Sequence, residues 1–301
     1  MSARPELPSR LADRSRPPAG RPGSPMTWRI GLATGCCTDH PILDVLDAAE
    51  EAGFPGVEFG TPPRHFSPWD PEEVEAVMRR LPSLPCAPVS MHAPFGGLLD
   101  LANADAHERD VAIGRILTAA KALHHLGGML LVVHPTDLSR AHHDVESRLA
   151  CAADALRRLI DATSTFGVTV AIETPLPHLI GGHPDEFASL LQRVGPAARV
   201  CLDTGHTHLG GFTRRFVELA GERLVHIHAH DNHGHFDDHL PPGDGGIDWP
   251  AIVTMMDDVK YVGWIILELK CPDTPMAEYF RRARRQAEHL LNGVVTVPHG
   301  S

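Results

Sequence analysis

Short apolar runs rich in β-branched residues alternate with longer segments of helical period, and the alternation occurs eight times from Thr27 onward. Several helical segments end just before a glycine that leads into the next apolar run, as at Gly53 and Gly167. The pattern predicts strands over residues 28–35, 56–60, 88–94, 129–135, 168–175, 198–206, 224–232 and 264–270. It predicts helices over about 41–53, 70–81, 104–127, 143–166, 184–194, 213–221, 249–258 and 275–292.

Eight strand-then-helix units with no long structureless linker between them predict an α/β fold, a (β/α)8 TIM barrel in a single domain. We place this barrel at residues 27–295, between a disordered N-terminal tail over residues 1–26 and a C-terminal tail over residues 296–301. The alternative is an open doubly wound sheet. The segment ATGCCTDH (33–40) has neither the glycine spacing nor the later acidic residue of a dinucleotide-binding turn, which favours the barrel.

Composition narrows the functional classes. The hydrophobic content of 43% is ordinary for a soluble globular protein, and no apolar run approaches the roughly 20 residues of a membrane span, so no membrane association is expected. A net charge of −11 argues against a broad phosphate-binding surface. The six cysteines are scattered without a CxxC pair, which indicates reduced thiols and a cytoplasmic location.

Candidate metal ligands lie at the carboxyl ends of seven consecutive predicted strands, where barrel enzymes place their active sites. Carboxylates that follow apolar runs such as VTVAI carry a large desolvation cost unless a cation or a proton compensates it. Each residue singly has a structural explanation: a hydrogen-bonded histidine, for example, or a helix cap at Asp203. The joint pattern favours a shared site. In chain order the residues are Glu58, His92, His134, Glu173, Asp203 with His206 just beyond it, His228 and Glu268.

The stretch from Leu224 to Trp249 combines a β-branched strand with an unusual density of imidazoles and carboxylates, the ligands that zinc and manganese prefer. His228 is the best ligand candidate on this strand, because His226 is expected one layer deeper and His230 beyond the strand end. Asp237 and His239 are two residues apart, and the glycines over 241–246 would fold their loop back over the barrel mouth. The alternative is a His-rich surface loop.

With these residues in view, the chain resembles the xylose isomerase-like TIM barrel superfamily, in the branch of sugar and sugar-phosphate isomerases and epimerases that is related to endonuclease IV. The likeness runs from about Arg29 to Leu291, and its most specific segments are SMHAP (90–94), VVHP (132–135), AIETP (171–175), CLDTGH (201–206), HAHDNHG (228–234), DDHLPPGDGGIDW (237–249) and LELK (267–270).

The resemblance implies an isomerase or epimerase that acts on a small sugar, sugar phosphate or related polyhydroxy carbonyl compound through an enediolate. One divalent ion (zinc, manganese, magnesium or cobalt) would be held by Glu173, Asp203, His228 and Glu268, with both glutamates also forming the catalytic acid/base pair. Glu58, His92, His134 and His206 would bind substrate.

The resemblance to endonuclease IV leaves a second function open. Its three zinc ions would take a ligand set similar to His92, His134, Glu173, Asp203, His206, His228, Asp237, His239 and Glu268. The alternative function is therefore an apurinic-site zinc phosphodiesterase, and the number of ions expected at the site is one, with up to three as the alternative. The isomerase branch is favoured because GVEFG (56–60) and HAPFGGLLDL (92–101) resemble it and a basic DNA-penetrating loop is not evident. A catalytically silent binding barrel is the third reading. The partner expected is a small sugar-like molecule rather than nucleic acid, and a homo-oligomer stays open.

Overall fold

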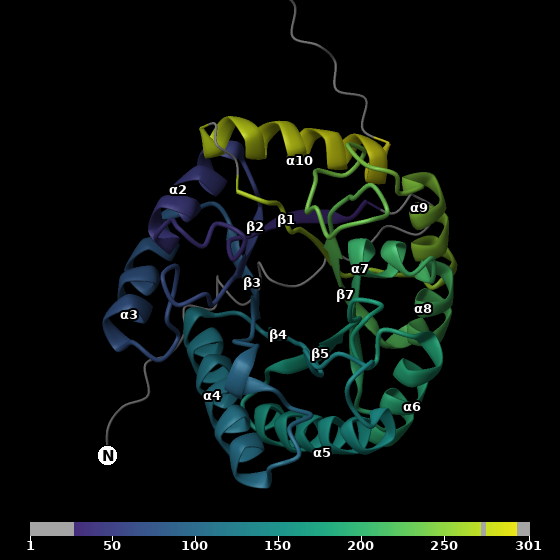
Figure 1. The fold of residues 1–301 in the computed structure, drawn as a ribbon. Coiled ribbons are helices and arrows are strands. Elements are labelled where there is room, and N and C mark those ends of the chain that lie inside the picture. Colours follow the sequence, from purple (N-terminus) through teal and green to yellow (C-terminus); the bar gives the residue numbers. More distant parts are fainter. Residues whose placement is uncertain (1–26, 272–274, 294–301) are drawn as a thin grey trace, which may run out of the picture.

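The computed structural model describes residues 27–271 and 275–293, which form a closed barrel of eight parallel strands inside a ring of helices (Figure 1). The strands are β1 Arg29–Ala33, β2 Gly56–Phe59, β3 Ala87–His92, β4 Leu130–Val133, β5 Thr169–Glu173, β6 Arg199–Asp203, β7 Leu224–Ala229 and β8 Trp264–Leu267. Each strand pairs with the next, and β1 closes the barrel on β8 with Leu32 opposite Leu267. The predicted TIM barrel is confirmed. Both predicted tails lie outside the described residues. The last two positions of the predicted barrel range, 294–295, also lie outside them.

Helices surround the barrel. They are α2 Ile42–Ala52, α3 Pro71–Arg80, α4 Ala106–Leu126, α5 Val145–Ser164, α6 Pro184–Val194, α7 Thr204–Leu209, α8 Thr213–Ala220, α9 Trp249–Asp258 and α10 Met276–Asn292, with short 3-10 turns at Leu81–Ser83, Gly97–Leu99 and Gly221–Arg223. All of these helices except the short α7, which lies at the carboxyl-end mouth, cover the outer face of the barrel (Figure 1). Aspartates cap several of the amino ends: the Asp105 carboxylate accepts hydrogen bonds from the backbone N–H groups of His107 and Glu108 at the start of α4.

Most strands of the structure end earlier than we expected at their carboxyl ends, where the side chains turn into the barrel mouth. The clearest difference concerns residues 204–206, which we expected to extend a strand and which form the first turn of α7 instead. The Asp203 side chain accepts a hydrogen bond of 2.7 Å from the backbone N–H of His206 and so ends β6 and caps α7. The helix-capping explanation of Asp203 is therefore confirmed.

The lower half of the barrel is filled by side chains. Trp264 and Ile266 occupy the space beside β1 and β2, and they fit because glycines face them. A Cβ on Gly56 would lie 2.6 Å from Trp264, and one on Gly31 would lie 2.6 Å from the Cδ1 of Ile266. With this floor packed, the barrel has its open space at the carboxyl-end mouth, where barrel enzymes place their sites.

The expectation that the cysteines are all reduced is wrong for one pair. Cys37 follows β1 and Cys271 follows β8, and the structure joins them in a disulfide with their Cα atoms 4.8 Å apart. They are 234 positions apart in sequence, and barrel closure makes them neighbours. The cysteine pattern therefore no longer supports a cytoplasmic location. Among the described helices, none has the length and apolar character to cross a membrane.

Candidate metal centre

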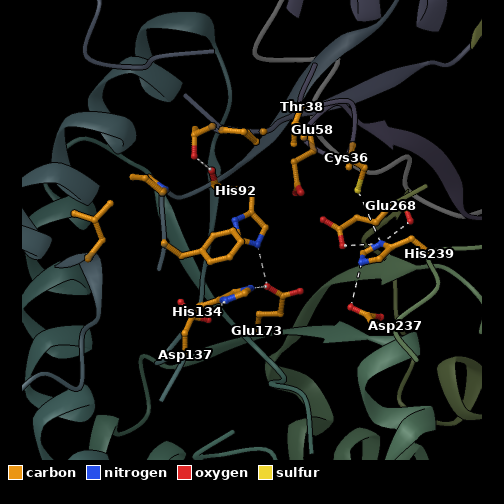
Figure 2. A pocket seen from close by; sticks show the side chains of 18 of the residues that line it. Cys36, Thr38, Glu58, His92, His134, Asp137, Glu173, Asp237, His239 and Glu268 are labelled. Atoms are coloured by element: carbon orange, nitrogen blue, oxygen red, sulfur yellow. Dashed lines mark hydrogen bonds and ion pairs between the residues drawn. The ribbon is translucent and has the colours of Figure 1, made fainter. Parts of the chain in front are cut away.

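A cavity of about 620 Å³ opens at the carboxyl-end mouth of the barrel, and Figure 2 shows its side chains converging from several strands. Its lining includes most of the residues expected at the site: Glu58, His92, His134, Glu173, His206, Asp237, His239 and Glu268. Asp203 and His228 lie beneath it, with no exposed surface. Segments that are far apart in the sequence thus bring their carboxylates and imidazoles to one place.

The centre of this cluster is formed by four residues from four strand ends. Glu173, Asp203, His228 and Glu268 each offer one ligand atom, and these atoms all lie within 4.8 Å of one another. The Nδ1 of His228 is 2.9 Å from the Oε1 of Glu173 and 3.6 Å from the Oε2 of Glu268. Ligand bonds to zinc are about 2.0–2.2 Å long, so ligand atoms at these separations can share one ion after small shifts.

A second group of possible ligands shares Glu173. The Oε2 of Glu173 lies 3.1 Å from the Nε2 of His92 and 2.8 Å from the Nε2 of His134. Figure 2 shows the two imidazoles approaching this carboxylate from neighbouring strands. Glu173 therefore stands between the central group and the pair of histidines, where it could bridge ions on both sides.

The loop after β7 supplies Asp237 and His239. The Nε2 of His239 is 3.2 Å from the Oδ2 of Asp237, and both side chains reach the cavity. His239 has a backbone φ of +49°, a conformation that is uncommon for a residue with a side chain and that clusters at functional sites. The loop is not simply extended here, yet the expectation that it directs both side chains to one point agrees with the geometry.

Asp231 holds this loop in place. Its buried carboxylate accepts hydrogen bonds of 2.8–3.0 Å from the backbone N–H groups of Asn232, Gly243 and Ile247 and from the indole N–H of Trp249. Its backbone also pairs with Leu240 in an isolated bridge. The loop is therefore fixed to β7 and to the start of α9, which positions the backbone of His239.

The histidines of the mouth share one orientation. Each donates its Nδ1–H to a fixed oxygen, because a carbonyl or carboxylate can only accept, and so directs Nε2 toward the cavity, where it would give up its proton to bind an ion. His92 donates to Ala93 O (3.0 Å), His134 to the Asp137 carboxylate (2.8 Å), His206 to Thr174 O (2.9 Å) and His239 to Glu268 O (3.0 Å). Second hydrogen bonds of this kind accompany almost all metal-binding histidines, so the donor set fits divalent ions.

His230 is a member of the site that our sequence reasoning excluded. It lies beyond the end of β7, as expected, and is fully buried there. Its Nε2 is 3.1 Å from the Oδ1 of Asp203, and its ring stacks on His239 with centroids 4.0 Å apart. It belongs to two of the possible metal groups, one with Asp203 and His206 and one with His239 and Glu268. The shared face of His228 and His230 was the signal that could have identified it.

Room for His230 comes from Gly205, where a Cβ would lie 1.9 Å from the imidazole Cε1. The glycine of the CLDTGH segment thus permits close packing between α7 and the end of β7.

Glu58 occupies a different environment from the rest of the expected substrate-binding residues. It is fully buried, with Oε2 accepting a hydrogen bond of 2.7 Å from Ser90 and lying 2.9 Å from the Nε2 of His226. Its Oε1 lies 2.9 Å from the Nε2 of His228, close enough for an ion pair although the ring N–H is not aligned for a hydrogen bond. Burial raises the pKa of Glu58, but the charges and hydrogen bonds of His228 and His226 outweigh burial and bring the pKa below its usual range.

In the metal-free cluster, buried carboxylates are paired with imidazoles, and this pairing determines the pKa values of both. Burial raises the pKa of Glu173, and the nearby His134 and His228 more than reverse this, so the pKa of the carboxyl ends well below its usual range. Burial lowers the pKa of His134, but the charge of Glu173 and the hydrogen bond to Asp137 raise it to about 10. For His206, burial likewise opposes the charge of Asp203 and the Asp237 contact, which raise its pKa to about 9. Without an ion, protons on the imidazoles compensate the carboxylates.

The fold and this mouth define a parallel β/α barrel with a metal-ligand cluster at its carboxyl end. A family model described as the xylose isomerase-like TIM barrel matches residues 46–291, and the chain belongs to this family. The resemblance seen in the sequence is thereby confirmed.

Curated relatives are distant. An uncharacterized protein of Methanocaldococcus jannaschii, MJ1311, is 25% identical over 190 residues, which cover 60% of this chain and 64% of the relative, so the chain spans just under two thirds of that protein. A probable endonuclease 4 of Acholeplasma laidlawii is 24% identical over 203 residues, covering 62% of this chain and 67% of the relative.

Solved structures share the fold. A D-tagatose 3-epimerase-like protein superposes with a TM-score of 0.75 at 20% identity, covering 88% of this chain and 98% of that one. An IolI protein with a bound zinc atom gives a TM-score of 0.75 at 17% identity, covering 89% of this chain and all of that one (100%). At these identities the likeness shows the architecture of the barrel.

Proposed function

We propose that this protein is a divalent-metal-dependent isomerase or epimerase of a small polyhydroxy carbonyl compound. The observation that carries the proposal is the meeting of Glu173, Asp203, His228 and Glu268, with ligand atoms all within 4.8 Å, at the floor of a cavity large enough for such a molecule. Three carboxylates at one buried point are costly without a cation.

Glu173, Asp203, His228 and Glu268 would hold the ion. Bound there, zinc, manganese, magnesium or cobalt would polarise a substrate carbonyl as a Lewis acid. Glu173 and Glu268 would remove and return a proton at the carbon next to that carbonyl, by way of an enediolate. The depressed pKa of Glu173 supports an ionised carboxylate at neutral pH, ready to act as a ligand or a base.

The remaining histidines of the mouth would orient the substrate or take further ions. His92, His134 and His206 present Nε2 to the cavity, where each could bind a hydroxyl group. Asp237 and His239 belong to the same proposal as additional metal ligands. Glu58 was expected to bind substrate. Its contacts favour a different role, which is to hold the ring of His228 in position from below the cavity.

The known neighbours support this choice of reaction. Structural neighbours that cover nearly all of their own chains carry names such as D-tagatose 3-epimerase-like protein, and one of them binds zinc. The chain resembles these proteins over its barrel, and the proposal extends their type of reaction to it. A small-molecule partner follows from the proposal, while the cytoplasmic location and a homo-oligomer stay predictions.

Metal content and isotope exchange test the proposal together. We expect about one tightly bound divalent ion per chain and solvent deuterium entering a ketose or keto-inositol at the carbon beside the carbonyl. Elemental analysis of the purified protein and NMR of a substrate panel in heavy water measure both. Absence of exchange across the panel with metal-loaded protein would contradict the proposal.

The second candidate is a zinc phosphodiesterase of the apurinic-site endonuclease type. It is favoured by the second group, His92, His134 and Glu173, which shares Glu173 with the central group and offers a place for a further ion. The distant endonuclease 4 relative also favours it. About three zinc ions per chain together with cleavage of a duplex that contains an abasic site would establish it in place of the isomerase.

A further inference from the structure

We propose that the substrate is uncharged and unphosphorylated, and that it carries an apolar substituent which packs on an aromatic and aliphatic wall at the outer part of the cavity. This inference rests on the proposed function, because it assigns a substrate class to the same site. We call the residues Trp69, Pro94, Phe95, Leu99, Leu176 and Leu179 the apolar wall; all of them line the cavity.

Phe95 is the central residue of the apolar wall. Its ring is 53% exposed although its centroid lies 4.1 Å from that of His134 and 4.9 Å from that of His92. An exposed phenylalanine whose ring lies tilted against two candidate metal ligands presents a flat face directly beside the reacting end of the cavity. Such a face binds the ring of an aromatic group or the C–H side of a sugar.

Trp69 extends the wall toward solvent. It is 36% exposed, and the guanidinium of Arg115 lies 5.4 Å from the centre of its ring. That cation–π contact fixes the indole from outside, so the wall keeps its shape without a ligand.

The charge of the lining disfavours a phosphate. Among the described residues around the cavity there is no lysine and no arginine, whereas Glu58, Asp137, Glu173, Asp237 and Glu268 all contribute carboxylates. Proteins that bind phosphate supply guanidinium or ammonium groups or a helix amino end to it. A phosphorylated sugar would instead bring a dianion to a cavity whose described lining offers it neither a guanidinium nor an ammonium group.

The size of the cavity leaves room for a substituent. Its volume of about 620 Å³ equals roughly twenty water molecules. A six-carbon ketose at the metal group would fill only part of it. A keto sugar joined to a phenyl or similar apolar group would fill more of the cavity and contact the apolar wall.

Ligand binding tests this with three probes that share one reacting end: methyl 3-keto-glucoside, phenyl 3-keto-glucoside and the 6-phosphate of the methyl compound. Dissociation constants come from saturation-transfer NMR titration of the protein with its own metal complement. We expect the phenyl compound to bind about tenfold tighter than the methyl compound, and the phosphate about tenfold weaker. Tighter binding of the phosphate, no advantage for phenyl, or no binding of the phenyl compound would overturn the proposal.

Two matched variants locate the effect. Phe95→Ala is expected to abolish the ratio between the phenyl and methyl affinities, and Phe95→Leu to keep part of that ratio. Leu98→Ala is the control, since Leu98 belongs to the same segment and is 73% exposed but does not line the cavity. Equal affinities for the phenyl compound in Phe95→Ala and wild type would overturn the proposal. Binding is measured without turnover, so the two proposals can fail separately. If deuterium exchange fails while the protein still prefers the phenyl compound, the proposed reaction is rejected and the inference about the apolar wall is retained.

Discussion

The Nε2 of His228 lies 2.9 Å from the Oε1 of Glu58, beneath the cavity, where both side chains are fully buried. The opposite ring nitrogen of His228 faces Glu173 and Glu268. A carboxylate behind a metal-binding histidine holds the ring in position and strengthens it as a ligand.

Replacing Glu58 by Gln should therefore weaken metal binding by about 10–100-fold, since the negative charge behind His228 is lost. Competition with a chelator measures the affinity, and thermal unfolding shows whether the fold is kept. Glu72→Gln, on the exposed face of α3, is the control and should bind metal as the wild type does. Equal affinities in E58Q and wild type would show that Glu58 does not support the site.

Glu268→Gln should lower kcat by about 10²–10⁴-fold while the fold is intact, because an amide can neither accept nor return the proton. The measurement is deuterium exchange into the best ketone substrate under saturating metal. Glu278→Gln, at an exposed position of α10, provides the control. Undiminished exchange in E268Q would mean that the acid/base pair is assigned wrongly.

Asp231→Ala should cost at least about 3 kcal/mol of unfolding free energy, because four buried or half-buried N–H groups lose their acceptor. The loop over 232–248 should also become sensitive to protease. Asp248→Ala offers a comparison at an exposed position: it removes one helix-capping hydrogen bond, from Ala251 N, and should cost only about 1 kcal/mol. Urea unfolding measures both free energies. Similar losses of unfolding free energy in the two variants would contradict the claim that Asp231 holds the loop in place.

Gly205→Ala should destabilise the protein by about 1–3 kcal/mol and weaken metal binding, since the added methyl group displaces His230 from Asp203. Gly114→Ala makes the same chemical change where nothing lies within 4 Å, in the exposed middle of α4, and should stabilise by up to about 1 kcal/mol. Both effects can be read from unfolding curves with and without added zinc. A G205A protein as stable as G114A would refute the packing argument.

His65 gives a pH dependence away from the metal ligands. Its Nδ1 donates to His40 O at 2.7 Å and its Nε2 accepts from the Thr34 hydroxyl at 2.8 Å, and burial lowers the pKa of the imidazole below its ordinary 6.5. The unfolded chain therefore takes up a proton at a higher pH than the folded one. Stability from His65 is complete above about pH 6.5 and is lost as the pH falls through the lowered pKa.

The test compares unfolding free energies between pH 7 and pH 5. His65→Gln should show a shallower loss than the wild type over this window, whereas His107→Gln, at an exposed position of α4, should follow the wild type. A slope unchanged in H65Q would show that His65 does not carry the dependence.

Much of the architecture could be predicted from the sequence because the patterns that define each element are local. Strands and helices of a β/α barrel alternate in chain order, so each apolar run and each helical segment predicts its own element. Because the carboxyl ends of parallel strands lie on one face, Glu173, Asp203 and Glu268 are predicted to lie together without any long-range information. The end of β6 was misjudged because the capping of α7 by Asp203 depends on one hydrogen bond that no periodicity reveals.

Four features were decided by the tertiary structure alone. Closure of the barrel pairs Cys37 with Cys271, which no spacing rule connects. Tight packing over Gly205 brings His230 inward, to Asp203. The burial of Glu58 adds contacts with His226 and His228 to a residue that also lines the cavity, and the exposure of Phe95 appears only once its ring is placed beside His134. Local patterns determine which residues can face a shared mouth, but contacts between side chains from different strands, and the space that surrounds them, exist only after the barrel has closed.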